Sequence, residues 1–312
     1  MSSFLALIGE GPKGTLLGQI EYLVQSNDNA DIVSSDDEFK YIDDLSVLTL
    51  ILLSGLLVEY DFHSHIPSDI GTEEKFLPPE SYAVQNTLNS ISDWTKINLM
   101  KLNPAKCKYM IFSRSGEKFT TRLKLDDMNL ERANVLKILG LYITENLSWS
   151  KNCSEICRKA YSRMQLITKL KYVGVKTEDL IEVYVLYIRS LAEYCSVAFH
   201  PSLTIEQSNK IERIQRTALK IILGDMYIDY SAALEMSSLD TLYARRTKRC
   251  LDFALKSTKH IKNQRMFPPN EQHCHSIRNS EKYKVNYART SRYLQSTIPY
   301  CQRLLNKYSQ EQ

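Results

Sequence analysis

Residues 40–45 read Lys-Tyr-Ile-Asp-Asp-Leu, and the adjacent carboxylates of Asp43 and Asp44 decide which fold to expect. Carboxylate oxygens are the ligands that Mg²⁺ prefers in proteins. Successive side chains of a strand point to opposite faces of a sheet, so a continuous strand would separate the two carboxylates. At a tight hairpin tip both can approach one metal pocket. The stretch therefore predicts a β-hairpin with a magnesium site at its turn, with Asp43 and Asp44 as ligands.

The surroundings distinguish this pair from the two other Asp-Asp pairs of the chain, Asp36-Asp37 and Asp126-Asp127. For any single pair, acidic residues in a polar turn are the alternative interpretation. Residues 45–58 (LSVLTLILLSGLLV) follow the pair as an apolar run of 14 residues. A membrane-spanning helix needs about 20 such residues, so we expect a buried strand leading away from the pair.

The charges of the chain are divided unevenly along its length. Residues 1–80 hold 3 basic and 15 acidic residues, whereas residues 81–312 hold 37 basic and 21 acidic residues. This division predicts metal binding in the first segment and phosphate binding in the second. Chance segregation together with an acidic surface loop is the alternative.

Composition and cysteine usage set broad limits. The chain has 312 residues, of which 43% are hydrophobic and 24% charged, as is usual for a soluble globular protein of one large or two smaller domains. We expect no signal peptide, an intracellular location in cytoplasm or nucleus, and free thiols for the seven cysteines. Cys153 and Cys157 with His260 and residues 273–275 lack the spacing of a zinc finger.

The pattern of apolar residues predicts a β-rich first part and a helical second part. Residues 11–18 predict a loop that leads into a helix capped by Thr15. The predicted elements that follow are a helix over 81–100, strands over 109–113, 121–130 and 135–144, helices over 150–171, 177–198, 204–224 and 239–262, an exposed linker over 263–282 and a weaker helix over 283–308.

Basic residues crowd two of these predicted helices. In 204–224 an apolar stripe (Ile205, Ile211, Ile214, Ala218 and Ile221) lies beside a basic face. A basic helix face is often only a solvated surface, but two in succession favour a surface that follows a phosphate backbone. The candidate backbone contacts are Lys210, Arg213, Arg216, Lys220, Arg245 and Arg246.

The order of motifs along the chain resembles a reverse transcriptase of a Jockey-like non-LTR retrotransposon. Residues 9–28 resemble the family's second palm motif, and Tyr41-Ile42-Asp43-Asp44 resembles its aromatic-X-Asp-Asp motif. Residues 84–114 resemble the next palm helix and strand. Ile138-Leu139-Gly140-Leu141 resembles the hairpin at the border of palm and thumb, and residues 149–249 resemble the thumb, including Glu193-Tyr194-Cys195, His200-Pro201 and Ile211-Glu212-Arg213-Ile214-Gln215.

The resemblance implies an α+β right-hand polymerase: a partial palm (1–148) with an antiparallel sheet and helices, an all-α thumb (149–262), and a linker with a C-terminal helical tail (263–312). It implies an RNA template and a DNA primer as partners, Mg²⁺ as cofactor, no membrane and no protein partner. The implied roles are metal ligation and catalysis by Asp43 and Asp44, stabilisation of the departing pyrophosphate by Lys106, and nucleotide or template binding by Lys13, Gly14, Thr15 and Tyr41.

The family's first palm motif, which supplies a further metal-binding Asp, would lie before residue 9, and residues 1–8 do not contain it. Lys13 also stands where the family has Gln. We therefore expect an N-terminally truncated relative that binds Mg²⁺ weakly and is inactive as a polymerase by itself. The alternatives are a non-catalytic nucleic-acid-binding module and a retroelement remnant without function.

Overall fold

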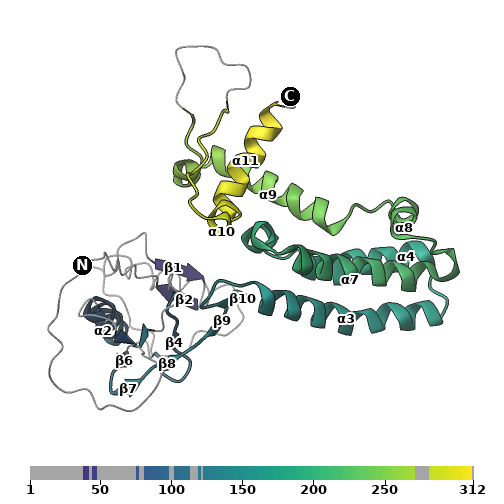
Figure 1. Cartoon of the computed structure of the whole chain (residues 1–312). Coiled ribbons are helices and arrows are strands. Elements are labelled where there is room, and N and C mark those ends of the chain that lie inside the picture. Colours follow the sequence, from purple (N-terminus) through teal and green to yellow (C-terminus); the bar gives the residue numbers. More distant parts are fainter. Residues whose placement is uncertain are drawn as a thin grey trace, which may run out of the picture. The chain divides into compact units, whose positions relative to one another are not determined.

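The computed structural model describes residues 38–41, 44–47, 75–76, 81–97, 102–112, 119–120, 122–270 and 281–310. The chain divides into two compact units, Met1–Asn134 and Val135–Gln312, whereas the resemblance placed a boundary after residue 148. The described residues form a mixed fold of mostly helices with small two-stranded sheets, as predicted for an α+β chain (Figure 1).

The first unit contains the hairpin predicted around the aspartate pair. Strands β1 (Glu38–Tyr41) and β2 (Asp44–Val47) pair antiparallel in a register that places Tyr41 opposite Asp44. The hairpin prediction is therefore confirmed in its strands. The predicted strand over 45–58 is described only in its first residues.

Helix α2 (Ser81–Ile97) confirms the helix predicted over 81–100, and it packs on strand β6 (Lys124–Leu125). The Gln85 side chain makes a two-way contact with this strand. Its Nε2 donates to the Lys124 carbonyl at 2.7 Å, and its Oε1 accepts from the Lys124 N–H at 2.9 Å. A side-chain amide that replaces a missing backbone partner in this way fixes helix and strand together.

The strand predicted over 121–130 is wrong, because the chain reverses at Asp126-Asp127 and returns as β7 (Met128–Asn129). Asp126 accepts a hydrogen bond from the Ser92 hydroxyl at 3.0 Å and pairs with Lys96 at 2.8 Å. This acidic pair is thus a structural turn anchored to α2. For this pair, the alternative interpretation of acidic residues in a polar turn is correct.

The remaining strands of the first unit are short and form separate pairs, not one antiparallel sheet. The strand predicted over 109–113 extends only over Lys108–Tyr109. Two parallel pairs complete the described strands of this unit: β3 (Lys75–Phe76) with β5 (Phe119–Thr120), and β4 (Lys108–Tyr109) with β8 (Glu131–Arg132).

The second unit begins with the predicted hairpin of β9 (Val135–Ile138) and β10 (Leu141–Thr144). Its two loop residues, Leu139 (φ 46°) and Gly140 (φ 87°), both have positive φ, as a type I′ turn requires. A side chain at Gly140 would meet a neighbouring ring, since an added Cβ would lie 3.3 Å from Cε1 of Tyr194.

Helices make up most of the second unit. They are α3 (Ser150–Tyr172), α4 (Thr177–Val183), the π-helix η2 (Tyr184–Arg189), α5 (Ser190–Glu193), α6 (Ser196–Phe199), η3 (His200–Ser202), α7 (Ile205–Leu223), η4 (Gly224–Met226), α8 (Tyr230–Ser237), α9 (Leu242–Lys259), η5 (Ile261–Met266), α10 (Ser291–Leu294) and α11 (Thr297–Gln310). The predicted helices over 150–171, 204–224 and 239–262 are confirmed as α3, α7 and α9.

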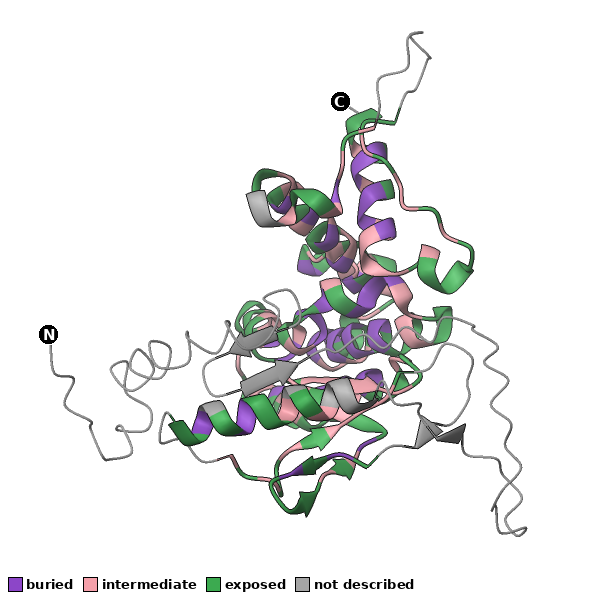
Figure 2. Cartoon of the chain, turned by 90° about the vertical axis from the view of Figure 1, so that its left-hand side faces the viewer, coloured by how far each residue is buried: buried purple, intermediate pink, exposed green. Residues whose placement is uncertain are grey.

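Helices α3 and α7 lie side by side and run in the same direction (Figure 1). The contacts between them progress together along both helices: Gln207 donates to Ser150, Cys157 donates to the Lys210 carbonyl, and Lys171 donates to the carbonyls of Ile221 and Ile222. Buried residues fill the space between the helices of this unit (Figure 2). This packing confirms the amphipathic pattern of α7, except that Ile205 at its first position is 83% exposed.

The helix predicted over 177–198 is interrupted. A π-helical turn over Tyr184–Arg189 keeps Tyr184, Ile188 and Ala192 on the buried side. The chain then breaks at Cys195, which adopts the left-handed conformation with φ 49°. Just before this break, the Tyr194 hydroxyl donates to the Leu139 carbonyl of the β9–β10 turn at 2.7 Å.

The C-terminal part, including helix α11, packs on α9. Phe267 is buried within the segment predicted as an exposed linker. It shares a buried apolar cluster with Cys250 and Ala254 of α9 and with Cys301 and Leu305 of α11. Helix α8, which the sequence did not predict, lies between α7 and α9 in the chain.

Candidate nucleic-acid interface

One side of α7 presents four cations, here called the basic α7 face: Lys210, Arg213, Arg216 and Lys220. The helix starts with a capping box, in which the Thr204 hydroxyl accepts from the Gln207 N–H and the Gln207 side chain accepts from the Thr204 N–H. Its opposite side is buried, which leaves all four cations exposed to solvent.

Two tyrosines lie beneath the basic α7 face. The Arg216 guanidinium lies 4.7 Å from the Tyr230 ring centroid, and Lys220 Nζ lies 5.3 Å from that of Tyr227. Contacts of this kind hold cations in place without neutralising them. Arg213, Arg216 and Lys220 have no carboxylate partner among the described residues, whereas Lys210 pairs with Glu206 at 2.7 Å. Three uncompensated cations therefore face the solvent from one helix.

The predicted role of Arg246 in backbone binding is wrong, because its side chain is fully buried. Its Nε donates to His200 Nδ1 at 3.3 Å, and its Nη2 donates to the Ser208 hydroxyl at 3.2 Å. Burial lowers the pKa of Arg246. Burial is also the main cause that lowers the pKa of His200 to about 4, and the positive charge of Arg246 is the second cause. Arg246 is a structural residue of the interior.

Arg245, the other predicted backbone contact of α9, forms an ion pair with a buried carboxylate. It bonds through Nε and Nη2 to Glu193, a buried carboxylate that also pairs with Arg249 at 2.7 Å and with Arg189 at 3.5 Å. Burial alone would raise the pKa of Glu193, but hydrogen bonds from Arg245 and Arg249 lower it below the usual range. Three arginines are therefore held around one buried anion, and of these the Arg249 side chain remains 49% exposed.

Behind the basic face, Glu212 and Gln215 lock α7 to its neighbours. The Glu212 carboxylate accepts from the N–H groups of Leu242 and Tyr243, each at 3.0 Å, at the start of α9. Gln215 accepts from the Tyr184 hydroxyl at 2.8 Å and donates to the Asp240 carbonyl at 2.9 Å. Because these buried groups are hydrogen-bonded, the network fixes the orientation of α7, the helix that carries the basic face.

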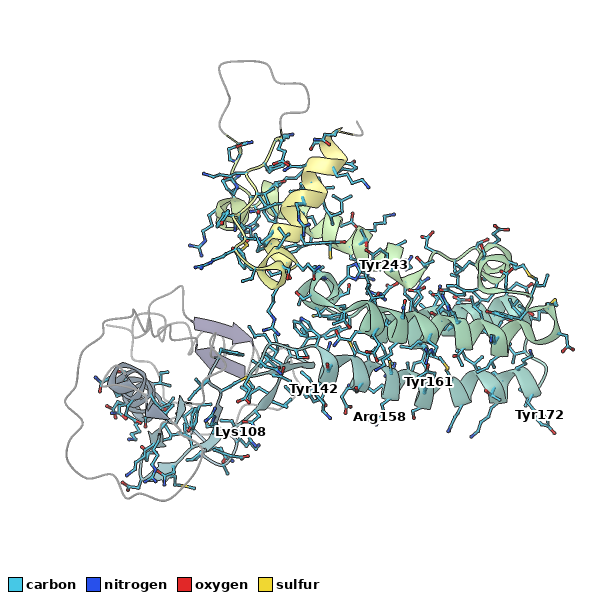
Figure 3. All side chains as sticks on the ribbon, viewed as in Figure 1. Lys108, Tyr142, Arg158, Tyr161, Tyr172 and Tyr243 are labelled. Carbon is cyan, nitrogen blue, oxygen red and sulfur yellow. The ribbon has the colours of Figure 1, made fainter. Side chains whose placement is uncertain are left out.

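The structure shows a second outward face that the sequence prediction missed. Arg158, Tyr161 and Tyr172 project from the outer side of α3, where Tyr172 is 92% exposed (Figure 3). Lys169 lies on the same helical line and is exposed. The available signal was the spacing of these four positions, which are three, eight and three residues apart and so fall on one side of a helix. Alternating basic and aromatic residues suit contact with a nucleic-acid strand.

The predicted metal site is described only in part. Asp44 is the first residue of β2 and Tyr41 the last of β1, whereas Lys13, Gly14, Thr15 and Asp43 lie outside the described residues. The residues that would hold Mg²⁺ are Asp43 and Asp44, whose carboxylates are of the donor type that this ion prefers.

Lys106, the predicted pyrophosphate partner, is exposed in a turn where its N–H donates to the Asn103 carbonyl at 3.0 Å. No contact in the described part of the chain joins it to the hairpin that carries Asp44.

Among the described residues, no group of three or more His, Cys, Asp or Glu side chains is arranged to hold a metal ion. The Cys153 thiol is buried, which raises its pKa to about 12 and keeps it protonated. No described helix combines the length and apolar character needed to cross a membrane.

Comparison of the chain with protein-family models, curated proteins and solved structures found no match. The relation to reverse transcriptases that the order of the motifs suggests is therefore a proposal.

Proposed function

We propose that this chain is related to the reverse transcriptases of non-LTR retrotransposons and binds an RNA–DNA hybrid through the basic α7 face. The observation that carries the proposal is a set of three solvent-facing cations, Arg213, Arg216 and Lys220, that lack carboxylate partners among the described residues. Two of them, Arg216 and Lys220, lie over the rings of Tyr230 and Tyr227. Phosphate groups would complete their ion pairs. In this proposal the first unit is a partial palm and the helical unit a thumb.

The rigidity of the supporting structure favours specific placement of a bound strand. Because Glu212 and Gln215 tie α7 to α8, α9 and η2, the cations keep a fixed spacing along one helix line. A duplex backbone that lies along α7 would meet Arg213, Arg216 and Lys220 in turn. The α3 outer face, with Tyr161 and Tyr172, adds rings for stacking against unpaired bases.

The test measures binding of a labelled RNA–DNA hybrid by fluorescence anisotropy as a function of salt. The triple variant Arg213→Gln/Arg216→Gln/Lys220→Gln removes up to three phosphate contacts. We expect the slope of log K against log salt to become shallower by about 2–3, since each contact contributes about 0.9. The matched control, Lys248→Gln/Lys256→Gln/Lys259→Gln, removes the same charge from exposed positions of α9.

The result decides between local contacts and overall charge. If only the α7 variant reduces the slope, the basic α7 face holds the backbone. If both triple variants reduce it equally, net charge alone attracts the hybrid and the proposal is overturned.

Nucleotidyl transfer is the second candidate function, and the register of the β1–β2 hairpin favours it, because it places Tyr41 opposite Asp44. In two-metal polymerases, carboxylates of this kind hold ions about 3.5–4 Å apart. Primer extension on an RNA template with Mg²⁺ or Mn²⁺ is the assay. Extension that Asp43→Ala abolishes would establish catalysis, whereas binding without extension leaves the chain a nucleic-acid-binding module.

A further inference from the structure

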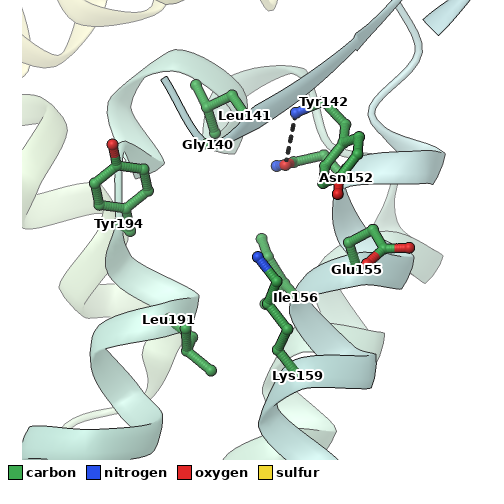
Figure 4. Close-up of a pocket in the computed structure, with 9 residues that line it drawn as sticks. All are labelled: Gly140, Leu141, Tyr142, Asn152, Glu155, Ile156, Lys159, Leu191 and Tyr194. Atoms are coloured by element: carbon green, nitrogen blue, oxygen red, sulfur yellow. Dashed lines mark hydrogen bonds between the residues drawn. The ribbon is translucent and has the colours of Figure 1, made fainter. Parts of the chain in front are cut away.

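A small pocket lies between the turn of the β9–β10 hairpin and the first turns of α3 (Figure 4). Its volume is about 70 Å³. A single water molecule needs roughly 10–15 Å³ of such space, so the pocket has room for a larger group. Leu141, Ile156 and Leu191 form apolar walls, and the ring of Tyr194 closes one side. None of its lining residues belongs to the basic α7 face.

Asn152 places an unpaired donor in this pocket. The residue is only 2% exposed, and its Oδ1 accepts a hydrogen bond from the Tyr142 N–H at 3.3 Å. This bond fixes the orientation of the amide, and Nδ2 is then left without a hydrogen-bond partner in the described part of the chain. A buried N–H group is costly unless an acceptor meets it, so the pocket is incomplete without a ligand atom that accepts.

Lys159 adds a positive charge to the same space. Its side chain lines the pocket and its Nζ points toward Asn152 (Figure 4). No described carboxylate pairs with it. Glu155, the acidic residue of the pocket, is already engaged by Lys151 at 3.1 Å and by Arg158 at 3.0 Å. Hydrogen bonds from these two residues lower the pKa of Glu155, which therefore stays ionised and paired.

We propose that this pocket binds one phosphate-sized oxyanion, whose oxygens accept hydrogen bonds from Asn152 Nδ2 and Lys159 Nζ. An apolar ligand would leave both donors unpaired, and a cation would face Lys159 at close range. An oxyanion satisfies both groups at once with charge-assisted hydrogen bonds. Free inorganic phosphate and a phosphodiester of a nucleic acid share this chemistry, and they differ in what else must fit around the pocket.

The experiment follows the side-chain amide resonance of Asn152 in NMR spectra of the isotope-labelled full chain. Inorganic phosphate is titrated first and a short RNA oligonucleotide second. Asn152→Asp keeps the oxygen that accepts from Tyr142 but replaces the donor by a negative charge. Lys159→Gln removes the charge and keeps most of the side-chain length. Lys256→Gln, at an exposed position of α9 outside both proposed interfaces, is the control for an equal loss of charge.

In wild type we expect a saturable shift of the Asn152 amide. With Lys159→Gln, the same amide should titrate about tenfold more weakly, which corresponds to about 1.4 kcal/mol. In Asn152→Asp, binding is followed at the Tyr142 backbone amide and should be lost. Lys256→Gln should titrate like wild type. If only the oligonucleotide produces the shift, the oxyanion is a phosphodiester.

Unchanged titration in Lys159→Gln, or no shift with either probe, overturns the proposal. Lys159→Gln alters one polar side chain at the pocket mouth, so it remains informative if Asn152→Asp fails to fold. The pocket and the basic α7 face share no residue, so the triple α7 variant can fail while this titration succeeds, or the reverse.

Discussion

Replacing Glu212 by Gln removes the negative charge that holds the start of α9. The carboxylate accepts from the Leu242 and Tyr243 N–H groups, each at 3.0 Å, and from the Tyr230 hydroxyl. A Gln side chain of the same length offers one oxygen, and its NH₂ group would face a backbone donor. One hydrogen bond to a charged group, worth about 1.5–3 kcal/mol, is lost together with an interaction with the helix N-terminus of up to about 2 kcal/mol.

We therefore expect Glu212→Gln to lower the free energy of unfolding of the helical unit by about 2–4 kcal/mol. The control is Glu206→Gln in the same helix, because the Glu206 side chain is 77% exposed and pairs with Lys210 at the helix surface. An exposed pair of this kind is worth about 0–1 kcal/mol.

Urea unfolding followed by tryptophan fluorescence measures this difference. The chain has two tryptophans. In a Trp94→Phe background, the fluorescence reports Trp149, whose ring centroid lies 5.9 Å from that of Phe199 inside the helical unit. Equal losses in Glu212→Gln and Glu206→Gln would refute the idea that Glu212 anchors α9.

Three further predictions concern stability. His200 is neutral in the folded chain with a pKa of about 4, whereas the unfolded chain protonates it near 6.5. Protons therefore bind the unfolded state preferentially between these two pKa values, and the free energy of unfolding should fall by about 2 kcal/mol from pH 7.5 to pH 5 through this group. Urea titrations of His200→Gln should show a correspondingly weaker dependence of this free energy on pH. A pH dependence equal to that of wild type would contradict the assignment. Lys171→Met should lower the melting temperature by a few degrees, because its ammonium donates to the Ile221 and Ile222 carbonyls at 2.7 and 3.0 Å; Lys169→Met is the control, and equal shifts contradict a capping role. Gly140→Ala should destabilise more than Gly174→Ala in calorimetry, since both have positive φ but only Gly140 meets a ring; equal losses would mean that the Tyr194 contact costs nothing.

The sequence predicted the helices that have strong apolar periodicity. In α7, Ile211, Ile214 and Ala218 are fully buried as their spacing indicated. The break at Cys195 was not predicted in this way, and the residue before it, Tyr194, contacts a turn 55 residues earlier in the chain. Local patterns carry no information about such a distant partner.

The candidate interface was predicted in part for a related reason. Arg246 and Lys220 both stand in basic segments, but Arg246 shares a line of four-residue steps with Leu242, Cys250 and Ala254, all fully buried. The prediction counted the basic residues of the helix without their positions around it. The four-residue spacing places Arg246 on the buried side of α9. The cations of α7 lie on the side of the helix that faces away from its buried residues, and their exposure was predicted correctly.

The cross-helix contact of Glu212 also constrains the order of assembly. The Leu242 N–H at the start of α9 donates to the Glu212 carboxylate of α7, which lies 30 residues earlier in the chain. A helix of this length is marginal alone, so α9 should form its first turn only after α7 is docked nearby. During synthesis, Glu212 emerges first and stays hydrated until Leu242 follows. The helical unit should therefore mature from α3 and α7 outward, with α9 and the C-terminal helices added last.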